Sequence, residues 1–126
     1  MDIGVDIVEI DRIAKQTRNP HFLKRVYTPG EVAYCRARKN SAQHFAVRFA
    51  AKEAVWKAIA AAIVRRSSGG TARGARLTHR DIQVRNRANG KPEIFLAKPF
   101  QKLARRVSIS LSHGREYAVA MAIYEP

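Results

Sequence analysis

The segment Ser41–Val64, SAQHFAVRFAAKEAVWKAIAAAIV, decides the fold of this chain. It contains no glycine or proline, and alanine, valine, isoleucine and phenylalanine dominate it, so it predicts one long helix. At about 100° per residue, small side chains cover most of the surface and the large apolar ones gather on one face. Such a helix is typical of a protein interior or a subunit interface. The large apolar residues are Phe45, Phe49, Trp56, Ile59 and Ile63.

Four charged residues interrupt the apolar surface of this predicted helix: Arg48, Lys52, Glu53 and Lys57. Glu53 and Lys57 are i, i+4 neighbours, and Arg48 and Lys52 form a second such pair on another face. The simplest interpretation of Glu53 and Lys57 is a solvated ion pair worth about 0.2–0.5 kcal/mol. A functional interpretation depends on the rest of the chain.

The composition is that of one folded and strongly basic domain. The 126 residues, of which 46% are hydrophobic, are enough for a single core, so we expect one domain over residues 1–126. The 24 Lys and Arg residues exceed the 10 Asp and Glu residues, giving a formal net charge of +14. Such a surface attracts a polyanion or an acidic protein. The single Cys35 excludes an intrachain disulfide and a multi-cysteine metal site.

The chain shows no signal for a membrane. No apolar run reaches the length of a membrane-spanning helix. Met1 leads directly into a strand-like segment without a basic leader, and we therefore expect a cytoplasmic protein that does not interact with membranes.

The first ten residues, MDIGVDIVEI, predict a strand. Apolar Ile3, Val5 and Ile7 alternate with other residues, which indicates one buried face, with Asp6 on the opposite face near the end of the strand. A carboxylate at a strand end is most often solvated or capping, and a metal site would need a second carboxylate from elsewhere. Asp11 is expected to cap a short helix that begins at Arg12.

A polar and basic region follows. Phe22, Leu23, Val26 and Tyr27 predict a short amphipathic helix, and Thr28 is placed to cap another helix over Glu31–Ala37. Its basic residues are interpreted either as ordinary solvated surface or as a docking face for an acidic partner; that face would contain Arg12, Lys15, Arg18, Lys24 and Arg25.

The second half of the chain predicts mostly strands. Arg65–Arg76 is a Gly- and Ser-rich basic loop that lacks the spacing of a phosphate-binding loop. Asn89–Gly90 is a favoured hairpin turn. His113 falls in a turn, where it is either simply exposed or a phosphate contact. The expected elements are strands at Asp81–Arg85 and Glu93–Leu96, a short helix at Lys98–Arg105, and paired strands at Val107–Leu111 and Tyr117–Ile123.

Three segments carry a resemblance to a known family: GVDIVEIDRI at 4–13, RFAAKEAVWKAI at 48–59 and VSISLSHGREYAVAMAI at 107–123. With NGKP at 89–92 they resemble the bacterial 4′-phosphopantetheinyl transferases of the holo-[acyl-carrier-protein] synthase type. The resemblance implies an α+β fold, with an antiparallel sheet packed on one long central helix plus short helices. It also implies a homotrimer whose active sites lie between protomers. One departure is that the helix continues through AAAIVRR into SSGGTARGAR, where the family usually has a Gly-Thr-Gly turn.

The resemblance also implies an activity. The family transfers the 4′-phosphopantetheine moiety of coenzyme A to a serine of apo acyl carrier protein, a step required for fatty acid biosynthesis, and leaves adenosine 3′,5′-bisphosphate. Asp6 and Glu53 match its metal-binding positions, for Mg²⁺ with Mn²⁺ as an alternative, because hard cations prefer oxygen ligands. Glu53 or a metal-bound water would accept the serine proton. Lys57 would neutralise the pyrophosphate.

Further positions match contacts to the nucleotide end of coenzyme A, namely Arg48, Gly90, Lys91, Pro92 and His113, and Lys52 is expected to contact a phosphate as well. Acyl carrier proteins are strongly acidic, so they offer a partner for the +14 charge other than nucleic acid.

Two other classes of function remain open at this point. A small nucleic-acid-binding module would explain the charge, but it leaves Asp6 and Glu53 without a role, and no nucleic-acid recognition motif is present. A structural protein that has kept the fold without the activity is the second alternative, and the matched metal and phosphate positions argue against it.

Overall fold

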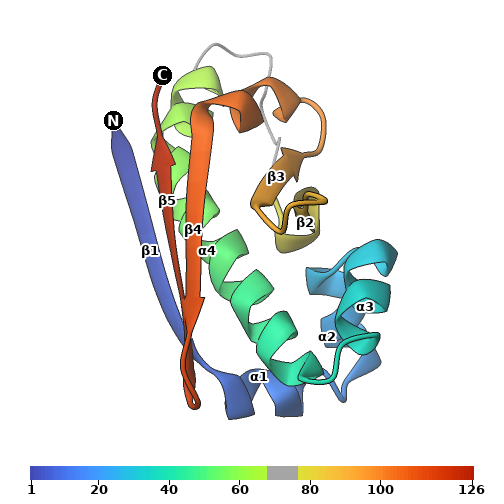
Figure 1. Cartoon of the computed structure of the whole chain (residues 1–126). Helices are drawn as coiled ribbons and strands as arrows, with labels where there is room; N and C mark the ends of the chain where they lie inside the picture. Colours follow the sequence, from blue (N-terminus) through green and yellow to red (C-terminus); the bar gives the residue numbers. More distant parts are fainter. Residues whose placement is uncertain (68–76) are drawn as a thin grey trace.

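The computed structural model describes residues 1–67 and 77–126, apart from the side chains of residues 66 and 67. Eleven elements occur in the described chain (Figure 1). They are β1 (Asp2–Glu9), α1 (Ile10–Gln16), α2 (Pro20–Val26), α3 (Pro29–Arg36), α4 (Ser41–Ser67), η1 (His79–Asp81), β2 (Ile82–Asn86), β3 (Pro92–Leu96), η2 (Gln101–Arg106), β4 (Val107–His113) and β5 (Tyr117–Tyr124).

Helix α4 is the centre of the molecule. An antiparallel sheet of three strands, in the order β1-β5-β4, covers one side of this helix, and β5 pairs with both neighbours along nearly its whole length. The separate β2–β3 hairpin and helices α2 and α3 lie on the other side of α4, while α1 lies at its N-terminal end (Figure 1). The predicted α+β fold, with an antiparallel sheet on one long helix, is confirmed.

The apolar character of α4 is explained by burial from both sides. Ala46, Ala50, Ala54 and Ala58 are completely buried, as is the larger Ile59. Because both sides of the helix are covered within one chain, its apolar surface does not by itself require a second subunit. Trp56, which the pattern placed with the buried residues, is instead 39% exposed.

Strand β1 approaches α4 closely at Gly4. A Cβ atom at this position would overlap the carbonyl oxygen of Ala54 and would lie 2.8 Å from the backbone nitrogen of Ala58. No other residue type would allow the strand backbone so near to the helix backbone. The face of β1 that contains Gly4, Asp6 and Val8 therefore packs towards α4.

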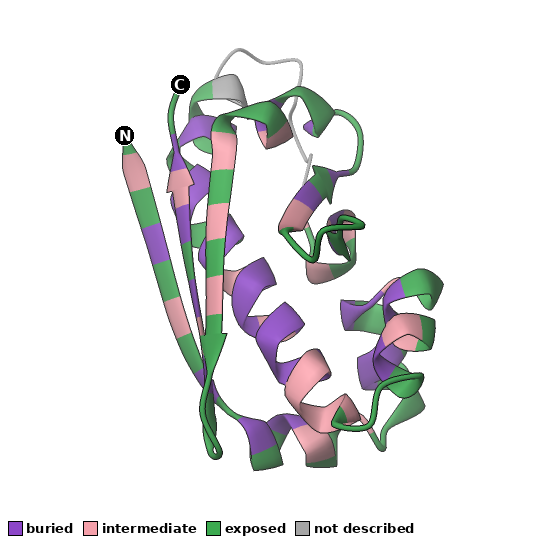
Figure 2. Ribbon diagram, viewed as in Figure 1, coloured by how far each residue is buried: buried purple, intermediate pink, exposed green. Residues whose placement is uncertain are grey.

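This packing corrects the expected orientation of β1. Ile3, Val5 and Ile7 were expected on the buried face, but they are 57%, 52% and 60% exposed. Side chains alternate between the two faces of a strand, so when Gly4 faces the helix these three must face outward. Figure 2 shows the alternation in burial along β1 and β5. Tyr117 and Met121 of β5 are exposed as well.

Several local predictions are confirmed, and others are corrected. Thr28 caps α3 in a capping box with Glu31, as expected. Asp11 does not cap α1, because the helix begins at Ile10 and Asp11 lies in its first turn. The helix predicted at Lys98–Arg105 is a 3₁₀ helix over Gln101–Arg106. Of the predicted loop Arg65–Arg76, residues 65–67 belong to α4 and residues 68–76 lie outside the described chain.

Lys52 links three parts of the chain through the interior. Its side chain is completely buried, and the ammonium group donates to Glu31 Oε1 at 2.8 Å, to the carbonyl of His79 at 2.9 Å and to the carbonyl of Ile82. The second carboxylate oxygen of Glu31 accepts from the backbone N–H of Val84 at 2.9 Å. This fully bonded pair fixes α3 and the start of the β2–β3 hairpin against α4.

Within residues 1–67 and 77–126, no helix combines the length and the hydrophobicity that crossing a lipid bilayer requires.

The contact at Gly4 predicts a stability effect. Gly4→Ala should lower the free energy of unfolding by about 1–3 kcal/mol, because the added methyl group meets backbone that has no room to move. Gly114→Ala is the matched control, since its Cβ would meet nothing within 4 Å, and it should change stability by less than about 0.5 kcal/mol. Urea unfolding of both variants measures the difference. Equal stabilities would show that β1 can shift away from α4 at little cost.

Candidate active site

The first part of the site lies where β1 packs on α4. Asp6 Oδ1 is 3.3 Å from Lys57 Nζ, and the same ammonium group donates to the carbonyl oxygen of Val5 at 2.9 Å. The structure thus brings together two of the residues that the sequence assigned to catalysis. Asp6 Oδ2 is buried and has no hydrogen-bond partner among the described residues.

The surroundings of Asp6 raise the pKa of its carboxyl group. Burial raises the pKa of Asp6, and the Glu53 carboxylate raises it further, while the hydrogen bond and charge of Lys57 lower it. The net direction is upward because the loss of hydration outweighs the attraction of the lysine. The negative charge of Glu53 therefore acts on Asp6 across the β1–α4 contact.

Glu53 is hydrogen-bonded to His79, a residue that was not among the candidates from the sequence. His79 Nε2 lies 2.7 Å from Glu53 Oε1, and the imidazole ring stacks on Phe49 with 5.4 Å between ring centroids and 13° between planes. In the described chain Glu53 makes no ion pair with Lys57, because Lys57 turns to Asp6. The interpretation of these two residues as a simple i, i+4 pair is therefore wrong.

The residues at this contact fit a divalent cation. Asp6 has a buried carboxylate oxygen without a partner in the described part of the chain, and the nearby negative charge of Glu53 raises its pKa, so a cation would stabilise this environment. Among the described residues no group of three or more acidic, histidine or cysteine side chains could hold a metal alone. A site with two carboxylates suits Mg²⁺, which usually takes one or two carboxylates and completes its shell with water and substrate phosphates.

The second part of the site is a pocket of about 350 Å³ between the N-terminal half of α4, the β2–β3 hairpin and β4. Four residues expected to contact the coenzyme line it: Arg48, Gly90, Pro92 and His113. His113 lies at the end of β4 rather than in a turn, and its Nε2 accepts from the side-chain amide of Gln43 at 2.8 Å.

Arg48 is the main charged group at the base of this pocket. Its guanidinium lies over the Tyr34 ring, 4.1 Å from the centroid, and donates to Asn86 Oδ1. Arg48 is only 4% exposed, and its Nε has no partner within the described part of the chain. A buried cation without a carboxylate partner is costly unless an anion binds beside it. The sequence did not identify Tyr34 or Asn86, because both are distant from Arg48 along the chain.

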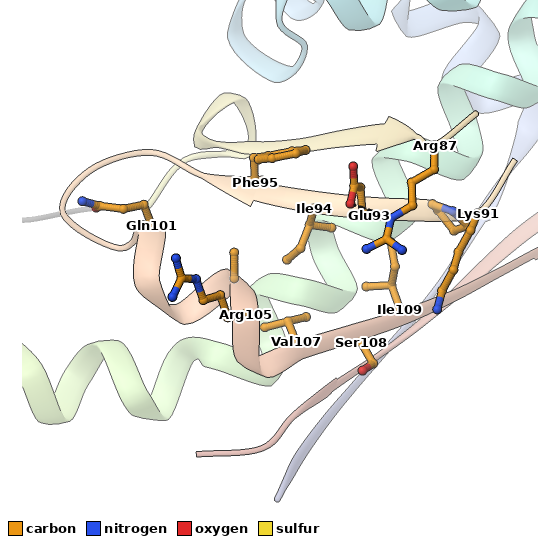
Figure 3. Close-up of a pocket in the computed structure, with 12 residues that line it drawn as sticks. Arg87, Lys91, Glu93, Ile94, Phe95, Gln101, Arg105, Val107, Ser108 and Ile109 are labelled. Carbon is orange, nitrogen blue, oxygen red and sulfur yellow. Dashed lines mark hydrogen bonds and ion pairs between the residues drawn. The ribbon is translucent and has the colours of Figure 1, made fainter. Parts of the chain in front are cut away.

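Lys91 lies over a neighbouring pocket of about 530 Å³, shown in Figure 3. Arg87, Lys91 and Arg105 give this pocket three positive charges, and Glu93 pairs with Arg87 at 2.8 Å. Gly90 in the hairpin turn has a φ of 87°, a conformation that strongly favours glycine and explains the Asn-Gly sequence. Pro92 lines both pockets, so the turn separates them.

Lys52 does not fit the role expected for it. All three of its N–H groups are used inside the protein, and its side chain has no exposed surface. It therefore has neither access nor a free donor for a phosphate, and we correct the expectation: Lys52 is a structural residue.

The two parts of the site are separate in one chain. None of Asp6, Glu53 and Lys57 lines either pocket that contains the expected coenzyme contacts. The basic residues expected to bind a partner are all exposed, and they belong to α1, α2 and the turn between them: Arg12, Lys15, Arg18, Lys24 and Arg25.

Comparison with known proteins shows which family the chain resembles in sequence and fold. Residues 2–122 match the family model of the 4′-phosphopantetheinyl transferase superfamily. The chain is 41% identical to the holo-[acyl-carrier-protein] synthase of Chloroherpeton thalassium, covering 100% of this chain and 98% of the relative.

Two solved structures are also similar. One is a holo-(acyl-carrier-protein) synthase from Bacillus anthracis in complex with CoA (3′,5′-ADP), with a TM-score of 0.73 and 33% identity over 98% of this chain and 94% of that one. The other is the Helicobacter pylori enzyme in complex with coenzyme A, with a TM-score of 0.74 and 29% identity over 98% and 99%. From its sequence match and its fold, the chain belongs to the 4′-phosphopantetheinyl transferase superfamily.

Proposed function

We propose that this protein is a holo-[acyl-carrier-protein] synthase. It transfers the 4′-phosphopantetheine moiety of coenzyme A to a serine of apo acyl carrier protein and releases adenosine 3′,5′-bisphosphate. The observation that carries this proposal is the pairing of Asp6 with Lys57 at the β1–α4 contact, where Glu53 acts electrostatically on Asp6 and Asp6 Oδ2 is buried without a partner among the described residues. Relatives of this name align over the whole chain, and similar structures contain coenzyme A.

The residues at the β1–α4 contact suit attack on a pyrophosphate. The serine oxygen forms a bond to the β-phosphorus as the bond from that phosphorus to the bridging oxygen breaks, and the negative charge passes to the leaving bisphosphate. Lys57, with half of its side chain exposed, stabilises that charge. Either Glu53 or a water at the cation site accepts the serine proton. A bound Mg²⁺, held by Asp6 and Glu53, supplies charge neutralisation at the pyrophosphate.

The positively charged pockets suit the nucleotide end of coenzyme A. Arg48 offers a buried guanidinium, and His113 and Lys91 lie at the rims of adjoining pockets. Phosphate groups bind well at such positions because each hydrogen bond is charge-assisted. We therefore retain Arg48, Gly90, Lys91, Pro92 and His113 as the coenzyme contacts of the proposal.

A homotrimer with shared sites is the second element of the proposal. The outer face of the sheet exposes Ile3, Val5, Ile7, Tyr117 and Met121, an apolar surface that a second copy of the chain would cover. The carboxylates and the coenzyme pockets lie apart within one chain, which supports a site completed between neighbouring protomers.

The basic face on α1 and α2 supports docking of an acidic carrier protein. Arg12 also acts electrostatically on Asp6, so this face is close to the β1–α4 contact where the serine would arrive.

The function places the enzyme in fatty acid biosynthesis, and its cytoplasmic location stays a prediction. One buried cluster contains residues from Val8 to Tyr124, which supports a single domain over residues 1–126.

The transfer itself and its dependence on a metal are tested together. Apo acyl carrier protein incubated with coenzyme A, Mg²⁺ and this protein should gain the mass of phosphopantetheine, EDTA should abolish the gain, and Mg²⁺ or Mn²⁺ should restore it. Asp6→Ala and Glu53→Ala should each lower kcat by at least about 10²-fold, the scale of losing a group that stabilises charge in the transition state.

Full activity in either variant would remove that residue from the site. A protein that binds tRNA or duplex DNA more tightly than apo carrier protein, and transfers nothing, would favour the nucleic-acid-binding module instead.

Assembly gives a further prediction. Sedimentation should show a trimer, and Val5→Asp should dissociate it, because the charge would be buried at the apolar sheet face. Mixing inactive Glu53→Ala with inactive His113→Ala chains should recover part of the activity, since mixed trimers contain some sites with both residues intact. A monomeric wild-type protein, or no recovery despite demonstrated subunit exchange, would contradict shared sites.

The docking face gives a prediction about salt. Exposed charges interact over about one Debye length, about 10 Å at 0.1 M salt, so raising the salt should increase the KM for carrier protein more than that for coenzyme A. Arg12→Glu and Arg25→Glu should reproduce this rise at low salt, with a smaller effect on turnover at saturating carrier protein. Arg48→Ala should show the opposite pattern. An unchanged KM for carrier protein in both charge reversals would place the docking face elsewhere.

A further inference from the structure

The contact between His79 and Glu53 is the best-defined interaction at the candidate active site that the proposed mechanism does not use. His79 begins η1, and its Nε2 lies 2.7 Å from Glu53 Oε1. An ionised carboxylate can only accept, so the hydrogen of this bond belongs to Nε2 and His79 is the donor.

The imidazole is held in place from several sides. Its ring stacks almost parallel on Phe49, one helical turn before Glu53. Its backbone carbonyl accepts from the buried ammonium of Lys52 at 2.9 Å. The carboxylate of Asp81 closes the turn by accepting from the backbone N–H and the hydroxyl of Thr78, each at 2.9 Å. The ring plane and the backbone of His79 are therefore both fixed before any ligand arrives.

The hydrogen bond constrains the rotation of the Glu53 carboxylate. Oε1 of Glu53 is bonded to His79, whereas Oε2 makes no hydrogen bond to any residue that the structure describes. Lys57 does not compete for it, because its ammonium contacts Asp6 and the Val5 carbonyl. Asp6 in turn has one buried oxygen without a partner among the described residues. Within residues 1–67 and 77–126, each of the two carboxylates thus has one oxygen that is hydrogen-bonded and one that is not.

We propose that His79 is a positioning residue that orients Glu53 so that its second oxygen, together with Asp6, binds the divalent cation. The inference rests on the proposed function and deepens it. Hydrogen bonds from outer groups to metal-binding carboxylates are a general device, and their loss typically weakens metal binding by about 10–100-fold. Because His79 is fixed by Phe49 and Lys52, it transmits the rigidity of the core to the carboxylate.

The hydrogen bond between His79 and Glu53 contributes little to the stability of the fold. The His79 side chain is 38% exposed and that of Glu53 is 28% exposed, so the net contribution of their bond to folding is small. The hydrogen bond from Lys52 to the backbone carbonyl of His79 already anchors η1. Any residue type at position 79 would keep this bond, because the acceptor is a backbone atom.

Two substitutions separate the hydrogen bond from the ring. His79→Phe keeps an aromatic ring to stack on Phe49 but removes the donor, whereas His79→Gln keeps an N–H donor of similar reach. Mn²⁺ binding is measured by electron paramagnetic resonance of the free ion, with coenzyme A present and carrier protein absent, so that no turnover occurs. His79→Phe should bind Mn²⁺ about 10-fold more weakly, and His79→Gln within about threefold of wild type.

Kinetics provide a second readout that a structural defect would not produce. The activity of His79→Phe at low Mg²⁺ should fall and should recover largely at high Mg²⁺, with the KM for carrier protein unchanged. In a Glu53→Gln background, His79→Phe should add little further loss of kcat, because both changes act through the same carboxylate.

The outcomes separate the two proposals. A folded His79→Phe protein, with a wild-type melting temperature and unchanged Mn²⁺ affinity, would overturn the positioning role, and so would a His79→Gln protein that binds Mn²⁺ as weakly as His79→Phe. Independent, multiplicative losses in the double variant would also overturn it. By contrast, a wild-type protein that transfers no phosphopantetheine would reject the proposed function itself.

Discussion

The backbone contact between β1 and α4 at Gly4 is the constraint on which the rest of the structure depends. Glycine on the strand and alanines on the helix let the two backbones approach more closely than side chains would otherwise permit. Asp6, two residues further along the same face, is therefore placed against the helix positions of Glu53 and Lys57. The candidate active site is a direct consequence of close packing, since a wider spacing would separate the carboxylates and hydrate them.

The same contact determines what the outer face of the sheet must be. Because Gly4, Asp6 and Val8 face inward, the period of two along a strand sends Ile3, Val5 and Ile7 outward. Strand β1 thus has the polar Asp6 on its inward face and apolar side chains on its outward face. An ordinary half-buried strand has the opposite arrangement. Under the proposed function, one geometric requirement accounts for both the placement of the metal-binding carboxylates and the need for neighbouring subunits.

Helix α4 directs Arg48, Lys52, Glu53 and Lys57 to four different environments. Successive residues are rotated by about 100°, so Lys52 and Glu53 are adjacent in sequence but point to different regions. Arg48 lies at the base of a pocket, Lys52 is buried with Glu31, Glu53 contacts His79 and Lys57 contacts Asp6. A single rigid element thereby links the core, the candidate coenzyme pocket and the candidate catalytic residues.

The sequence by itself determined the features that are local or that match family motifs. The long helix follows from an uninterrupted run of helix formers, the capping box from Thr28 and Glu31, and the hairpin turn from Asn89–Gly90. Only the tertiary structure decided which face of β1 is buried, because alternation defines two faces without saying which one meets the helix. It also decided that Lys52 is structural and that His79 contacts Glu53, since these partners are 21 and 26 residues apart and no local pattern relates residues at such separations.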